Sequence, residues 1–325
     1  MPKKKRTSRQ PKKTIDIQRS VLPSAATIFR AKILDAMSYQ MILKATDKIK
    51  PLLWARDGDI VKAIRSVETV EDLFSKIPLA NSLGADAWHE RARGFGEELV
   101  SLALKSLIEA PTLEDEDSKT QRYEILISEL RWRGKAGAIA LIDAFGVLDD
   151  YGKCLASLVL GLLGAVQSAD LIWKYYQEVQ TEDNENLFVG ALWGLIDLKD
   201  NRAADALYQR LIKQNYFYEL MGFLSLAGDE RSIVPLLVLV PELDEDQRWE
   251  PLMAASAIAH RIGRTATITE LSRRMPEDEQ EEEKDHVEGM ADLLLSNSKQ
   301  DIEEYFQIYY GGFSPDTISQ SLFNI

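Results

Sequence analysis

The chain contains few side chains of the kinds that carry out catalysis or bind metals. It has one cysteine, Cys154, and three histidines, His89, His260 and His286. One cysteine excludes a Cys-based zinc or iron–sulfur cluster and a disulfide scaffold within the chain. Glu90 follows His89, but position 93 is an arginine, so the metalloprotease signature with its second histidine is absent. We therefore expect no metal and no cofactor, and we expect Cys154, in an apolar helical stretch, to be a buried structural thiol.

The glycines do not form a phosphate-binding loop. Gly94 and Gly96 match the start of a dinucleotide-binding loop, but the third glycine is missing and no strand pattern precedes them. Lys135 and Lys153 each follow a glycine, but neither has the second glycine or the Ser/Thr of a P-loop. A Gly-x-Ser-x-Gly nucleophile motif is also absent. The residue types therefore favour a non-enzymatic protein, with an enzyme as the alternative.

The strongest binding signal is a basic segment at residues 1–20. This segment carries eight basic side chains and one acid, a net charge of +7, whereas the whole chain carries −13 and residues 21–325 therefore sum to −20. The residues that we expect to contact nucleic acid or an acidic partner are Lys3, Lys4, Lys5, Arg6, Arg9, Lys12 and Lys13. Such a segment attracts phosphate or carboxylate, while the acidic remainder repels a phosphate backbone. The run at 2–6 also resembles a nuclear localisation signal, and a solubilising tail without a partner is a third interpretation.

A second cationic cluster lies near the middle of the chain. It consists of Arg131, Trp132, Arg133 and Lys135. Three cations around one aromatic ring make a candidate site for a phosphate or a carboxylate-rich peptide. The alternative, which we favour, is that the two arginines pair with nearby acids, either Glu129 or those at 114–117.

The elements that must position these residues are predicted to be helices. From residue 24 onward nearly every stretch has helical period and strand alternation is scarce. We predict a helix that Ser24 caps and that runs to position 43, helices at 49–66 and 69–77, the second capped by Thr69, and one long helix at 85–110. The acidic, turn-rich stretch that follows is expected to be a linker.

Residues 122–275 read as five pairs of helices joined by short turns. The turns are expected near residues 134–135, 167–168, 200–201, 228–229 and 263–264. Their spacing, mostly in the low thirties, is typical of a solenoid of helical pairs. Gly161 and Gly194 lie late in the first helices of their pairs, where a small residue permits close helix contact.

Two of the turns share a pattern of Asp-x-Arg followed by apolar residues. Asp200 and Arg202 form it in one pair, and Asp229 and Arg231 form it in the next. An aspartate where a helix begins accepts from the free amide groups of that helix. The arginine two residues later can reach a neighbouring carbonyl or carboxylate. We interpret these four residues as structural.

This pattern over residues 122–275 resembles the HEAT-repeat family, in particular the short HEAT-like repeats of phycobilisome lyases. The resemblance implies an all-α fold, an α-solenoid of HEAT-like helical pairs. It identifies an architecture and leaves the function open, because such repeats serve as scaffolds in unrelated systems.

The predicted organisation has five parts. They are a disordered basic arm (1–23), an N-terminal helical region that is either divergent repeats or a cap (24–110), an acidic linker (111–121), the repeats (122–275), and an acidic loop with a final helical pair and a tail (276–325). The longest apolar stretch, at 154–166, has 13 residues, whereas a membrane span needs about 20. We therefore expect no contact with a membrane and a cytoplasmic location, or a nuclear one in a eukaryote.

The sequence favours an interaction scaffold that binds another protein and contacts nucleic acid non-specifically through residues 1–20. One alternative is a nucleic-acid-binding HEAT-like protein, including one that resembles DNA glycosylases. Another is an enzyme that resembles the chromophore lyases. The charge of −20 on residues 21–325 argues against the cationic groove that a glycosylase needs.

Overall fold

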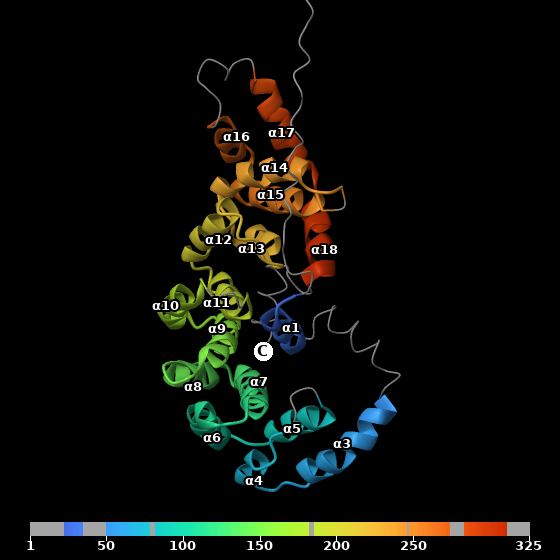
Figure 1. The fold of residues 1–325 in the computed structure, drawn as a ribbon, viewed down its shortest axis with the longest axis vertical. Coiled ribbons are helices and arrows are strands. Elements are labelled where there is room, and N and C mark those ends of the chain that lie inside the picture. The colour runs from blue at the N-terminus through green and yellow to red at the C-terminus, as the bar shows by residue number, and fades with distance from the viewer. Residues whose placement is uncertain are drawn as a thin grey trace, which may run out of the picture.

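The computed structural model describes residues 23–34, 50–78, 82–181, 185–245, 247–273 and 283–310, and within these ranges the chain forms helices and turns but no strand (Figure 1). The chain is an all-α solenoid, as predicted. The basic arm up to residue 22, the acidic loop at 274–282 and the tail at 311–325 lie outside the described residues.

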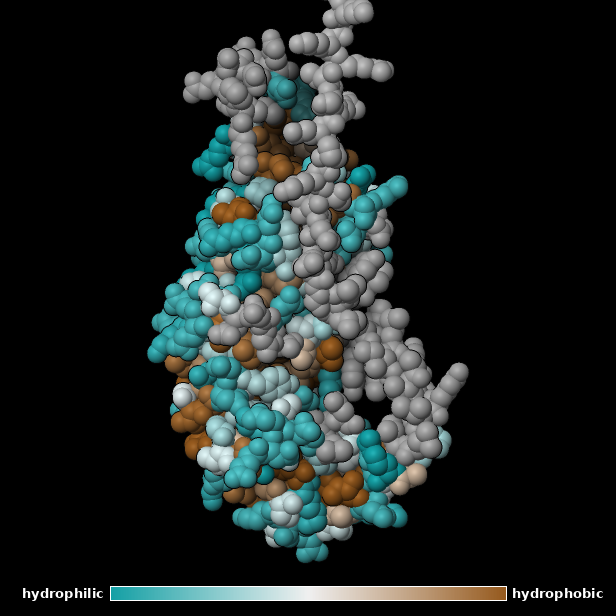
Figure 2. Space-filling model, in the orientation of Figure 1, coloured by the Kyte–Doolittle hydropathy of each residue, from teal (hydrophilic) through white to brown (hydrophobic). Residues whose placement is uncertain are grey.

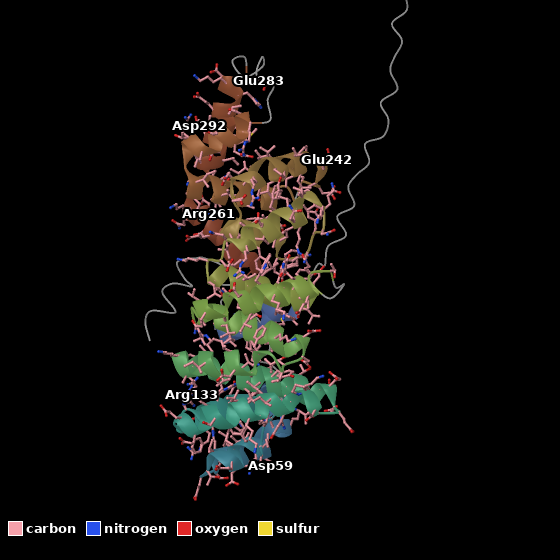
Figure 3. The ribbon with its side chains drawn as sticks, turned by 90° about the vertical axis from the view of Figure 1, so that its left-hand side faces the viewer. Asp59, Arg133, Glu242, Arg261, Glu283 and Asp292 are labelled. Atoms are coloured by element: carbon pink, nitrogen blue, oxygen red, sulfur yellow. The ribbon has the colours of Figure 1, made fainter. Side chains whose placement is uncertain are left out.

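Five helical pairs form the middle of the stack, and their turns lie where the sequence predicts them. The pairs are α7 (Glu116–Trp132) with α8 (Gly134–Phe145), α9 (Asp150–Leu162) with α10 (Ala169–Val179), α11 (Glu185–Asp197) with α12 (Arg202–Ile212), α13 (Leu220–Ala227) with α14 (Ile233–Leu239), and α15 (Trp249–Ile262) with α16 (Arg264–Ser272). Short 3₁₀ turns precede α10 and α14 (Val166–Ser168 and Glu230–Ser232), and another, Val240–Glu242, follows α14. The turns within the pairs lie along one edge of the stack, where Arg133 and Arg261 lie at separate levels (Figure 3).

The first helices of the pairs stack on one another, α7 on α9, α9 on α11, α11 on α13 and α13 on α15. We call the face that α7, α9, α11 and α13 present toward α1 the inner face (Figure 1). Helices α9 and α11 are in direct backbone-to-backbone contact, because glycines at the contact leave no side chain between them. A Cβ atom on Gly194 would lie 2.4 Å from the carbonyl oxygen of Ser157, and one on Gly161 would lie 2.7 Å from the Cα of Gly194.

The long helix predicted at 85–110 is wrong, because the chain forms two helices there. These are α5 (Leu83–Ala92) and α6 (Glu97–Glu109), separated at Gly94 and Gly96. The Arg133 side chain stabilises the break by donating to the carbonyl oxygens of Ala92 and Phe95 at 2.8 and 2.9 Å. Since α5 contacts α7 and α6 contacts α8, these two helices continue the stack as a further pair.

The acidic linker predicted at 111–121 is shorter than expected. A 3₁₀ turn, Ala110–Thr112, follows α6, and α7 begins at Glu116. The Asp115 carboxylate caps α7 by accepting from the Ser118 amide at 2.9 Å. Acids at 115–117 therefore start a helix, where they suit its dipole, rather than forming a loop.

At the N-terminal end, Ser24 caps α1 (Ala25–Ile33) and Thr69 caps α4 (Val70–Phe74), as predicted. Helix α1 ends at Ile33 rather than continuing to position 43, and residues 35–49 lie outside the described residues. Helix α3 (Lys50–Arg65) packs on α5. At the other end, α17 (Lys284–Ser296) and α18 (Lys299–Tyr310) form the final pair, and both contact α15.

Candidate functional site

Helix α1 lies against the inner face, where it packs on helices that come much later in the sequence. It contacts α9 and α11, and Figure 1 shows it in the hollow of the curved stack. Ala26 and Phe29 are buried in this contact. The helix has nine residues, too few to be stable alone in water, so the inner face must hold it in its helical form.

A buried carboxylate meets the N-terminal end of α1. Glu219, which directly precedes α13, is fully buried, and its Oε1 accepts from the Ser24 amide at 2.8 Å and the Ser24 hydroxyl at 2.7 Å. A negative charge is favourable there because the N-terminal end of a helix carries a partial positive charge. The other carboxylate oxygen, Oε2, is buried and has no hydrogen-bond partner in the structure as described.

Two residues of α11 hold the centre of α1. The Trp193 indole Nε1 donates to the Thr27 hydroxyl at 2.9 Å, and the Arg30 guanidinium lies 3.9 Å from the centroid of the Trp193 ring. Arg30 also donates to both carboxylate oxygens of Asp197, at 2.9 and 3.1 Å. Burial raises the pKa of Asp197, and the Arg30 charge opposes that shift. Arg30 and Asp197 are thus a buried ion pair, with side chains 2% and 0% exposed.

A cation meets the C-terminal end of α1. Arg131, on α7, donates to the Ile33 carbonyl oxygen at 3.0 Å. Carbonyl groups at the end of a helix lack partners within it and carry a partial negative charge, so a cation there is favourable. Burial lowers the pKa of Arg131, and the nearby Arg30 charge lowers it further. We call Arg131, Trp193, Asp197 and Glu219 the α1 cradle.

The surroundings of the cradle are acidic. Burial lowers the pKa of Lys32 on α1, and the charges of Glu124 and Asp86 oppose this shift. Burial in turn raises the pKa of Asp86, against the charges of Lys32 and His89. The inner face is therefore complementary to a basic helix.

The structure does not assemble the candidate anion site at 131–135. Arg133 pairs with the buried Glu129 at 2.7 Å, one of the two alternative partners, whereas Arg131 turns to α1. Trp132 is half-exposed beneath Arg131, and Lys135 is exposed. The two arginines thus serve different contacts.

The Asp-x-Arg residues form contacts within a pair and between pairs. The Asp200 carboxylate accepts from the Arg202 amide at 2.9 Å and from the Arg202 side chain at 2.8 and 2.6 Å. These bonds hold the pKa of Asp200 below its usual value. Arg202 also reaches Asp170 on α10, in the preceding pair, at 2.8 Å.

The next pair repeats this arrangement. Asp229 accepts from the Arg231 amide at 3.1 Å, and Arg231 reaches Asp205 on α12 at 2.6 Å. This contact between pairs does not continue into the next pair. Asp205, the partner of Arg231, lies three positions after Arg202, but the equivalent position after Arg231 is Val234, which has no carboxylate. These residues fasten neighbouring pairs together, which is a structural role.

A cleft of about 710 Å³ opens beside these turns. Leu226 and Ile262 contribute apolar surface to it, and Asp197 of the cradle also lines it. The charged groups at its rim include the paired Asp205 and Arg231. Lys199, Glu230 and Arg261 also line the cleft, so it presents charges of both signs and indicates no particular ligand.

Ser128, His89 and Glu129 form a cluster that the sequence does not indicate. Ser128 Oγ lies 3.2 Å from His89 Nε2, and His89 Nδ1 lies 2.9 Å from Glu129 Oε2, which is the connectivity of a Ser–His–acid triad. However, the Ser128 hydroxyl donates to the Ile125 carbonyl oxygen at 3.0 Å. The amides around Ser128 lie inside α7, where helix bonds occupy them and leave no donors for an oxyanion. The cluster therefore ties α5 to α7.

The rest of the described surface has few features of a site. In the view of Figure 2, hydrophobic residues are interspersed with hydrophilic ones rather than gathered in one broad patch. The described residues contain no group of three or more metal-ligating side chains, and Cys154 is buried. Nor does this part of the chain include a helix with the length and apolar character needed to cross a membrane.

Comparison of the chain with protein-family models, with curated proteins and with solved structures gives no match.

Proposed function

We propose that the protein is a non-enzymatic interaction scaffold that binds a helical segment of another protein at its inner face. The observation that supports this proposal is the α1 cradle, which holds a helix by both ends and by its centre. A solenoid offers an extended curved surface for binding, and in this chain that surface already accommodates a helix.

We further propose that the basic arm contacts nucleic acid non-specifically or an acidic partner. The arm joins the described structure at residue 23, directly before α1. Its net charge of +7 supports contact with polyanions, and the charge of −20 on residues 21–325 argues that the body does not bind nucleic acid by itself.

The scaffold proposal is tested by isolating the tagged protein from its host and mapping cross-links to bound proteins. We expect stoichiometric partners whose cross-links map to the inner face, and their loss in the Asp197→Ala variant. Asp292→Ala is the matched control, because Asp292 pairs with Arg264 at the exposed edge of the stack. Partners that the two variants retain equally would contradict an inner-face site.

The arm is tested separately by deleting residues 1–20 and titrating both forms with labelled DNA and RNA at several salt concentrations. We expect the deletion to leave the melting temperature unchanged and to remove the binding. Binding by the full chain should weaken with salt, with a slope set by at most about seven phosphate contacts. A truncated chain that binds as tightly as the full chain would refute this part of the proposal.

A further inference from the structure

The cradle distinguishes the two ends of the helix that it holds. The acid Glu219 lies at the N-terminal end of α1 and the cation Arg131 at the C-terminal end. Each charge complements the partial charge of the helix end that it meets. A helix bound in the reverse direction would place both charges against like partial charges, so the cradle selects one direction.

The cradle also selects side chains at fixed spacing. Ser24, Thr27 and Arg30 follow one another at three-residue intervals, which brings them to one side of the helix. Each meets its own polar partner, which is Glu219 for the serine, Trp193 for the threonine and Asp197 for the arginine. The ligand pattern is thus Ser-x-x-Thr-x-x-Arg, with the apolar Ala26 and Phe29 between.

We propose that the α1 cradle is a binding site for a short basic helix of a partner protein with this pattern, and that α1 is its exchangeable occupant. This inference rests on the proposed scaffold function and specifies the partner. The physical basis is that a buried ion pair roughly balances its own desolvation cost. The contact between Arg30 and Asp197 therefore selects a helix with an arginine at this position, but adds too little net free energy to prevent α1 from leaving the site.

Charge decides between a partner and a second copy of this chain as the incoming ligand. Two copies would bring together bodies that each carry −20, which repel one another. Asp197 within the cradle, together with Asp86 and Glu124 near Lys32, instead attracts a basic protein.

The test measures binding of a fluorescent peptide with the sequence of residues 23–34 to the full chain, by anisotropy. In the wild type, α1 competes for the site, so the apparent affinity is reduced by the small fraction of open cradle. We expect the Arg30→Gln chain to bind the peptide about tenfold tighter or more, because its own α1 has lost the pairing with Asp197. A peptide carrying the same Arg30→Gln change should bind that chain about tenfold more weakly, and Asp292→Asn should behave as wild type.

Thr27→Val is a second way to loosen α1, since it removes the hydrogen bonds that the Thr27 hydroxyl accepts from Trp193 and from Ser24. It replaces Arg30→Gln if that chain fails to fold. Equal peptide binding by the wild type and a folded loosened variant would overturn the proposal. A concentration-dependent dimer of the loosened chain in sedimentation would also overturn it, because the occupant would then be a second copy. Neither result would affect a host partner whose cross-links map to the inner face outside the α1 cradle, so the scaffold proposal is judged separately.

Discussion

Substitution of Gly194 by alanine tests the close contact between α9 and α11. The added Cβ would lie 2.4 Å from the Ser157 carbonyl oxygen, whereas ordinary contact begins at 3.4 Å, so the two helices must separate by about 1 Å. Overpacking typically lowers the free energy of unfolding by about 1–3 kcal/mol. We expect the upper value, about 3 kcal/mol, because the atoms that the new Cβ meets belong to the backbone and cannot rotate away. Alanine returns about 1 kcal/mol through its helix propensity. We expect a net loss of about 2 kcal/mol in the free energy of unfolding.

The assay is thermal unfolding followed by circular dichroism, in which 2 kcal/mol corresponds to a fall of about 3 °C for a chain of this length. Gly289→Ala is the matched control, because Gly289 is an exposed glycine inside α17 and its added Cβ would have no described atom within 4 Å. That variant should be more stable than the wild type by about 0.5–1 kcal/mol. If Gly194→Ala matched the wild type or exceeded it, the helices would not lie this close and our reasoning would be refuted.

Three further predictions concern the turns and the buried thiol. Asp229→Ala should lower the free energy of unfolding by about 1 kcal/mol through loss of the bond to the Arg231 amide, measured by urea unfolding, and an unchanged value would contradict the capping role. The pKa of Asp200 is depressed in the folded protein, so the ionised carboxylate stabilises the fold fully above its unfolded pKa of about 4, and this stabilisation is lost as pH falls through the folded pKa. The difference in free energy of unfolding between the wild type and Asp200→Asn should therefore shrink below a pH of about 4. A difference that stays constant with pH would argue against the Arg202 bonds. Burial raises the pKa of the Cys154 thiol to about 12, so it should resist Ellman's reagent at a pH of about 8 in the folded protein and react fully in urea, whereas rapid reaction of the folded protein would show that α9 is accessible.

The sequence predicts the turns of the stack well because their signals are local. Gly134 and Gly263 take positive φ at their turns, and Asp200 and Asp229 bond to the amide two residues ahead. Each of these preferences acts within a few residues, so a single sequence reveals it. The break between α5 and α6 cannot be located from local signals alone, because it also depends on Arg133, which directly follows α7.

The cradle could not be read from the sequence for the same physical reason. Arg30 and Asp197 are 167 residues apart, and an arginine in an amphipathic helix ordinarily faces solvent. The sequence contains one indication that the inner face is covered. Residues 154–162 of α9 are apolar or small on every side of the helix, and all of them are buried. A helix of that kind must be covered all round, but its sequence does not identify what covers it.

The distance between α1 and its cradle has a consequence for synthesis of the chain. Glu219 lies 195 residues after Ser24, so α1 leaves the ribosome long before its binding site exists. At about 5–20 residues per second, the interval is roughly 10–40 s. During this time the basic segment of the nascent chain is open to RNA. The apolar helix α9, once it has been made, still lacks the cover that α1 provides and is open to chaperones. Closure of the inner face by α1 can therefore take place only after α13 has begun to emerge.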